Sequence, residues 1–300
     1  QQVIGQTYKL ISREDDRNTR LNLQAEANKT EGLINYYSNE LKKAERNFEE
    51  AEKLYKDTQN IEGLAAIYNN LGGLYIFKGK WEKTETLMLK SLEYEEKRYN
   101  LNGIAYCYNN LGSLFGDKSD YKKALYYLNK ALKIQKLLND RYQIAVFYFN
   151  IGLTYKDFGD FKKAEANLKK SLQISITFNM FKNVDAALNA LGALYFKYGD
   201  WPKAIEYYKR AIEKSKSNNF YEGLCQSYNN LGEIHEKKGE FNVAYDFYSK
   251  SKELLPKFSD DFLEAHILGN LGSVLTSLHK FGEAYPYLVE SYEFFKKIDA

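Results

Sequence analysis

Apolar side chains recur along this chain in two alternating stripes, and the whole pattern repeats every 40 residues. In one block, Tyr68, Leu71, Leu74 and Tyr75 follow the i, i+3, i+4 spacing of a single helix face. A short turn follows, and a second stripe of the same spacing begins at an aromatic residue. Each block therefore predicts two helices joined by a tight turn, and the chain is predicted to be all-α.

Small and turn-forming residues keep the same register through six blocks. The first predicted helix of each of these blocks has a glycine at the same position, although a glycine there destabilises a helix by about 1 kcal/mol relative to alanine. We therefore expect a neighbouring helix to approach so closely that a Cβ would collide. The glycines of this column are Gly72, Gly112, Gly152, Gly192, Gly232 and Gly272.

The turns predict where each helix ends and the next begins. Gly199 suits a left-handed residue that ends a helix, Asp200 suits the next N-cap, and Pro202 falls in a first turn. We expect one domain over residues 1–300, with residues 1–20 as a partial helix of a preceding unit and more chain beyond one or both ends, because no polar cap is visible. The predicted repeats span residues 21–60, 61–100, 101–140, 141–180, 181–220, 221–260 and 261–300.

These columns resemble the tetratricopeptide repeat (TPR). The resemblance covers residues 21–300, and the repeat exceeds the usual length of about 34 residues. It is similar to the long repeats of kinesin light chain, spindle-orientation adaptors and bacterial pheromone-sensing regulators. The resemblance implies a right-handed α-solenoid of about seven helix–turn–helix repeats, with first helices lining a concave face. One block carries the family pattern in Tyr108, Leu111, Gly112, Phe115, Asp120, Tyr121, Ala124 and Ala131.

Composition narrows the class of protein. The net charge is only +3, so nucleic acid is not the expected partner, although lysine pairs on second helices leave an RNA-binding array as a minor alternative. No apolar run approaches the ~18 residues of a membrane span, and we expect no membrane association. Cys107 and Cys225 are the only cysteines, which predicts buried free thiols in a reducing, cytoplasmic protein.

Candidate chemistry is sparse, and we predict that the chain is not an enzyme. His235 occupies a column of buried aromatic residues, His279 falls in a turn, and His266 is expected to face the groove alone. Nucleotide-binding glycine loops, spaced metal-ligand sets and nucleophile motifs are all missing from the sequence. We therefore predict no catalytic residues, no metal and no cofactor.

Asparagines supply the one recurring chemical feature that packing does not readily require. Two adjacent columns of the first helices hold nine of them, with a gap at Ala190, although asparagine is a poor helix former. A carboxamide can pair with both the N–H and the C=O of an extended peptide. The predicted peptide-binding residues are Asn69, Asn70, Asn109, Asn110, Asn150, Asn189, Asn229, Asn230 and Asn270, with Tyr106 and Phe149 reading side chains.

The sequence thus favours a non-enzymatic scaffold that holds an extended peptide or protein segment through an asparagine ladder. The resemblance implies a part in signalling. The alternatives are that the amides only bond neighbouring helices, or that the chain is the sensory TPR part of a larger regulator: a peptide-pheromone-responsive factor or a TPR-fused histidine kinase. Some members of the family hold a terminal carboxylate with a clamp of lysine, asparagine and arginine. We do not expect this clamp here, because no lysine or arginine occupies the corresponding inner-face positions. We expect a neutral, aromatic groove in the N-terminal half and a more polar one in the C-terminal half. The oligomeric state and the ligand's identity stay open.

Overall fold

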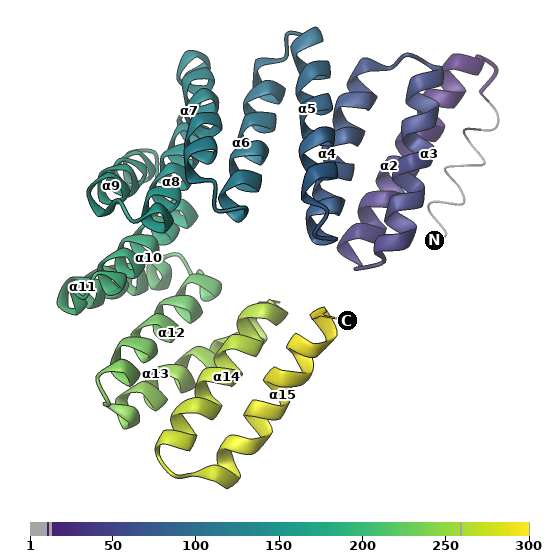
Figure 1. The fold of residues 1–300 in the computed structure, drawn as a ribbon. Helices are drawn as coiled ribbons and strands as arrows, with labels where there is room; N and C mark the ends of the chain where they lie inside the picture. The colour runs from purple at the N-terminus through teal and green to yellow at the C-terminus, as the bar shows by residue number, and fades with distance from the viewer. Residues whose placement is uncertain (1–10, 12–13, 259, 300) are drawn as a thin grey trace. The chain divides into compact units, whose positions relative to one another are not determined.

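The computed structural model describes Ile11, residues 14–258 and residues 260–299, and these residues form helices and turns without any β-strand (Figure 1). The predicted all-α class is confirmed. The chain divides into two compact units, residues 1–140 and residues 141–300, and each is described by itself. A single continuous solenoid over residues 1–300 stays a prediction. None of the described helices has the length and apolar character needed to span a bilayer.

Unit 1 consists of three helical hairpins, α2/α3, α4/α5 and α6/α7, in which each second helix also packs against the next first helix. The partial helix expected over residues 1–20 falls mostly outside the described residues, and α2 begins at Arg17. The helices are α2 (Arg17–Tyr37), α3 (Leu41–Asp57), α4 (Ile61–Phe77), α5 (Trp81–Lys97), α6 (Leu101–Asp117) and α7 (Tyr121–Leu138).

Unit 2 consists of four hairpins that pack in the same order. Its third hairpin is shortened: α13 stops at Leu254 and a 3₁₀ turn containing Pro256 follows, because proline has no N–H and clashes with the preceding helical turn. The elements are α8 (Arg141–Phe158), α9 (Phe161–Thr177), α10 (Phe181–Lys197), α11 (Trp201–Ser217), α12 (Tyr221–Lys237), α13 (Phe241–Leu254), η1 (Leu255–Lys257), α14 (Asp261–Ser277) and α15 (Phe281–Asp299).

The predicted turn chemistry is confirmed where α10 is followed by α11. Gly199 has a φ of +83°, in the left-handed region that glycine adopts without strain. The carboxylate of Asp200 then accepts a hydrogen bond from the backbone N–H of Lys203 at 3.2 Å, and Pro202 lies in the first turn of α11. Asp120 and Asp160 cap α7 and α9 in the same way.

The glycine column lies where the two helices of a hairpin meet, as predicted. A Cβ added to Gly192 would lie 2.7 Å from Tyr208 Cδ1 on α11, and one added to Gly72 would lie 3.1 Å from Met88 Cγ on α5. The neighbouring Leu71 and Leu191 are buried in the cores of their units. Each hairpin therefore closes tightly on its leucine stripe.

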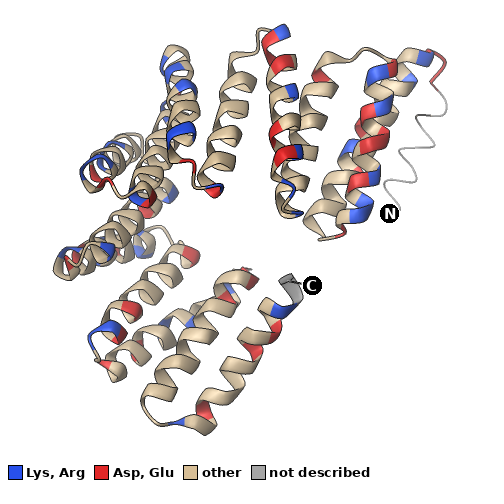
Figure 2. Cartoon of the chain, viewed as in Figure 1, with Lys and Arg blue, Asp and Glu red and all other residues tan. Residues whose placement is uncertain are grey.

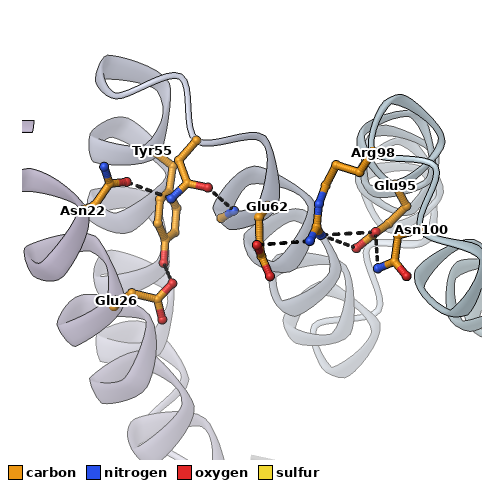
Figure 3. A network of polar contacts seen from close by, with 9 residues as sticks. Asn22, Glu26, Tyr55, Glu62, Glu95, Arg98 and Asn100 are labelled. Atoms are coloured by element: carbon orange, nitrogen blue, oxygen red, sulfur yellow. Dashed lines mark hydrogen bonds and ion pairs between the residues drawn. The ribbon is translucent and has the colours of Figure 1, made fainter. Parts of the chain in front are cut away.

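Charged residues are unevenly distributed among the helices of unit 1. Figure 2 shows α4 and α6 almost free of charge, whereas α3 and α5 carry both signs. Polar contacts gather in the turns that follow α3 and α5 (Figure 3). Asn60 Nδ2 donates to Asn22 Oδ1 at 2.8 Å, and Arg98 lies 3.1 Å from Glu62. Asn60 thereby joins the first two hairpins, while Arg98 and Glu62 join the end of α5 to α4.

Candidate functional site

Two asparagines of unit 1 bond each other from successive first helices. Asn110 Nδ2 on α6 donates to Asn69 Oδ1 on α4 at 2.7 Å. Asn70 and Asn109 are half-buried beside them, and Asn70 lines the same pocket as the bonded pair. Asn69 and Asn110 therefore each make one contact with a neighbouring helix, as the alternative to ligand binding expects.

Unit 2 repeats this arrangement twice. Asn230 Nδ2 on α12 approaches Asn189 Oδ1 on α10 at 3.3 Å, and Asn270 Nδ2 on α14 donates to Asn229 Oδ1 on α12 at 2.9 Å. In all three pairs the donor lies 41 residues after the acceptor. The pairs thus join one first helix directly to the next.

The pairs still have hydrogen-bonding capacity to spare, because a carboxamide has two N–H donors and two acceptor lone pairs. Among the described residues, Asn69 Nδ2 and Asn110 Oδ1 have no partner, and the same holds for Asn229 Nδ2 and Asn270 Oδ1. Such a pair therefore offers one donor group and one acceptor group, which complement the C=O and N–H of a peptide.

A pocket of about 250 Å³ surrounds the pair of unit 1. Exposed aromatic rings form part of its wall, with Tyr37 81% and Tyr106 58% exposed. None of the described residues that line it carries a charge. Besides Asn69, Asn70 and Asn110, the lining consists of Leu33, Tyr36, Tyr37, Phe48, Gly73, Ile76, Met88, Tyr106 and Ser113.

A larger pocket of about 900 Å³ contains Asn229, Asn230 and Asn270 of unit 2. Its lining mixes aromatic rings with four acidic side chains, one lysine and one histidine. The expectation of a more polar groove in the C-terminal half agrees with this pocket. The remaining lining residues are Glu222, Gln226, Glu233, Glu236, Lys237, Phe241, Tyr248, Asp260, Phe262, Leu263, His266 and Ser273.

Two carboxylates of this pocket differ in their surroundings. Glu236 accepts hydrogen bonds from Tyr248 Oη at 2.7 Å and Ser273 Oγ at 2.8 Å, which fix its position. Glu233 is half-buried and has no hydrogen bond or ion pair with any described residue. Burial raises the pKa of the Glu233 carboxyl, while the positive charge of Lys237 lowers it. A cationic ligand group would relieve the cost of keeping Glu233 charged there.

Phe149 and Asn150 line a separate pocket of about 320 Å³ in unit 2. Val146 and Tyr142, from the same helix α8, add further apolar surface, and Lys182 and Asn183 of α10 contribute the facing wall. The predicted side-chain reader Phe149 thus lies beside a ladder asparagine, as Tyr106 does in unit 1.

The histidines and cysteines take other positions. His235 is partly buried; its ring stacks on Phe247, and its Nδ1 contacts a carboxylate oxygen of Glu240. His266 was expected to be alone, but its ring contacts Phe262 and Phe295 because α14 and α15 pack closely there. Burial raises the pKa of Cys107 and of Cys225 to about 11, so both thiols stay protonated. No three His, Cys, Asp or Glu residues of the described chain gather closely enough to hold a metal.

The repeat pattern and the hairpin geometry agree with comparisons to known proteins. The sequence profile of the tetratricopeptide repeat matches residues 63–137, 143–217 and 226–258. The chain belongs to the tetratricopeptide-repeat family. No curated protein matches this TPR chain.

Solved structures share the TPR fold at low sequence identity. Aspartyl phosphate phosphatase F from Bacillus subtilis is 16% identical, covering 95% of this chain and 73% of that chain, with a TM-score of 0.72. A Rap protein complexed with Competence and Sporulation Factor is 20% identical, covering 92% and 76%, with a TM-score of 0.63. NprR in complex with its cognate peptide NprX is 19% identical, covering 91% and 81%, with a TM-score of 0.56.

Sequence reasoning missed residues behind and beside this TPR ladder. Glu233 and Glu236 are not among the predicted site residues, although they share the pocket of Asn230. Asp185 was missed entirely, although it stands in a column that otherwise holds alanine or cysteine. That break in the column was a signal that could have found it. Asn189 itself is 5% exposed, which leaves it little surface for direct contact with a ligand.

Proposed function

We propose that this TPR protein binds an extended peptide or protein segment along its first helices, without catalysing a reaction. The observation that carries the proposal is the set of Asn–Asn pairs on the walls of two pockets. Each such pair offers a donor and an acceptor that suit any peptide main chain. Neighbouring side chains, such as Tyr106 and Phe149, then select the sequence.

Two of the similar structures support this proposal through the complexes in which they were solved. One is a Rap protein complexed with Competence and Sporulation Factor, and another is NprR in complex with its cognate peptide. A sensory role within a larger regulator is the second candidate, favoured by a further similar structure described as the quorum sensor NprR from B. thuringiensis. The sequence of the intact gene tests it: an adjacent DNA-binding or kinase segment supports this role, and a gene encoding only the repeats removes it.

Peptide binding is tested by selecting ligands from a library of random short peptides on the purified chain. Calorimetry then compares wild type with Asn110→Ala and Asn270→Ala. Each change removes an unpartnered acceptor oxygen, so we expect a loss of about 1 kcal/mol, or roughly fivefold in affinity. Failure to select any peptide, or unchanged affinity in both variants, contradicts the proposal.

Matched controls are available on the second helices. Asn129 is exposed and Asn167 is partly exposed. They bond the carbonyls of Leu125 and Lys163 in their own helices, and neither lines the two pockets. Asn129→Ala and Asn167→Ala should leave affinity unchanged. Replacing single peptide N–H groups by N–CH₃ identifies the N–H that donates to each asparagine. Methylation of that group should weaken binding to wild type but not to the matching alanine variant.

A further inference from the structure

A buried carboxylate interrupts a column of small residues behind the asparagine ladder. Asp185 is 3% exposed, and the equivalent position in the other repeats holds alanine or cysteine. Burying a polar group is costly unless it is hydrogen-bonded, so a residue of this kind needs a compensating role. The equivalent residues are Ala65, Ala105, Ala145, Cys225 and Ala265.

Asp185 is the start of a connected chain of hydrogen bonds. Its Oδ1 accepts from Ser215 Oγ at 2.5 Å, and its Oδ2 accepts from Asn189 Nδ2 at 3.1 Å. Asn189 Oδ1 in turn accepts from Ser227 Oγ at 3.0 Å and from Asn230 Nδ2 at 3.3 Å. The chain begins in the buried interface of α10, α11 and α12 and ends at a residue that lines the large pocket.

The neighbouring helix has matching space. A Cβ added to Gly223 would lie 2.6 Å from Asp185 Oδ2, so the absence of a side chain there makes room for the carboxylate. Ser215 and Ser227 are also fully buried, at 1% and 0% exposed, and both donate into this cluster. Three helices therefore contribute to one polar cluster.

An ionised carboxylate accepts hydrogen bonds but cannot donate them. Asn189 therefore turns its Nδ2 toward Asp185, whose backbone oxygen also accepts from it at 3.2 Å, and its Oδ1 toward Asn230. Asn230 then donates through its Nδ2. We propose that Asp185 is a positioning residue that fixes the donor-to-acceptor direction of the Asn189–Asn230 pair. Asn230 Oδ1 is then the group left to accept a hydrogen bond in the pocket.

The other two pairs lack such a device. Asn69 has Ala65 one helical turn before it, and Asn229 has Cys225, whose sulfur contacts Ser251 instead. Both amides of those pairs can turn over together and exchange donor for acceptor. Reversing a peptide main chain reverses the order of its N–H and C=O groups. The fixed pair therefore sets the direction in which a peptide lies in unit 2. This last step rests on the proposed peptide binding.

The fixed direction is testable without a ligand, by NMR of protein labelled at asparagine side chains. In wild type, nuclear Overhauser contacts should join the Asn189 amide protons to Asp185 and not to the β-protons of Ser227. Contacts to Ser227 instead would overturn the proposal. This measurement needs no variant, so it decides the question even if substitutions at Asp185 fail to fold.

Asp185→Asn tests the cause. An asparagine there both donates and accepts, so the side-chain resonances of Asn189 and Asn230 should shift or double, while those of Asn229 and Asn270 stay in place. The control Ser251→Ala removes another buried polar contact of unit 2, to Cys225, and should leave Asn230 unmoved. An unchanged Asn230 in Asp185→Asn contradicts the proposal.

A peptide selected in the binding experiment supplies the functional readout. Wild type should prefer that peptide over the same sequence in reverse order by about tenfold or more, and Asp185→Asn should reduce this ratio severalfold. A ratio that Asp185→Asn leaves unchanged overturns the directional role. If no peptide binds at all, the proposed function fails, while the NMR result on the direction of the pair still stands.

Discussion

The pocket of unit 1 and the large pocket of unit 2 are built from equivalent helices, but charged side chains enter only the second among the described lining residues. Gly73 and Ile76 of α4 correspond, four repeats later, to Glu233 and Glu236 of α12. Tyr106 of α6 corresponds in the same way to His266 of α14. The asparagine pair stays the same while the side chains one turn away change.

This difference shows how one scaffold can separate two tasks. The amide pairs can contact main chain, which every peptide has, so they suit both pockets. The residues at the columns of Gly73 and Ile76, together with Glu222 and Asp260, make the surroundings acidic in the second pocket and leave them neutral and aromatic in the first. The two units can therefore be compared in stability as well as in chemistry.

The largest effect is expected from the leucine column that both units share. Leu71→Ala and Leu231→Ala, at 3% and 1% exposed, should each lower the free energy of unfolding by about 2–5 kcal/mol. Each unit has one tryptophan, Trp81 or Trp201, as a fluorescence reporter in urea unfolding, with the other changed to phenylalanine. Each leucine change should lower mainly the urea midpoint that is reported by the tryptophan of its own unit. Equal shifts of both midpoints would show that the units unfold together.

The glycine column should respond differently in the two units. Gly192→Ala places a methyl group against the ring of Tyr208 and should cost about 1–3 kcal/mol through overpacking. Gly72→Ala meets the flexible Met88 at a longer distance, and the gain in helix propensity of about 1 kcal/mol offsets part of the cost. Thermal unfolding of both variants measures the difference. A larger loss at Gly72 would contradict this account.

Charge should separate the pockets in binding. A selected peptide that contains lysine should bind Glu233→Gln/Glu236→Gln about tenfold more weakly than wild type at low salt, with a smaller difference at high salt. Its analogue with norleucine in place of lysine should not distinguish the two proteins. Glu213→Gln, an exposed change on α11, serves as the control. Equal losses for both peptides would show that charge is not what Glu233 and Glu236 recognise.

The smallest effect is expected from pH at Asp185. Burial raises the pKa of the Asp185 carboxyl, and the charge of Glu222 adds to this, while hydrogen bonds from Ser215 and Asn189 oppose it. With the folded-state pKa above the unfolded value, the folded state holds its proton more tightly, so stability rises as pH falls through the folded pKa toward the ordinary aspartate range. In urea unfolding, the free energy of unfolding of wild type should rise relative to that of Asp185→Asn as the pH is lowered. A difference between the two proteins that does not change with pH would contradict the raised pKa.

Local rules were enough to predict the hairpins from the sequence. The helix spacing of Leu71 and Tyr75, the capping by Asp200 and the close approach at Gly192 each depend on residues within about one hairpin. The short α13 also has a local cause in Pro256. A repeat every 40 residues made the predictions consistent, because each block supported the others.

Only the tertiary structure decided how the asparagines are used. The bond between Asn69 and Asn110 spans 41 residues, and the contacts of Asp185 with Ser215 and of Asn189 with Ser227 span 30 and 38. Side chains so far apart meet only when successive hairpins stack, and the orientation of an amide depends on all its partners at once. The sequence by itself determined the repeat, its hairpins and the face on which the asparagines lie; stacking decided which amides bond each other and which groups they leave open.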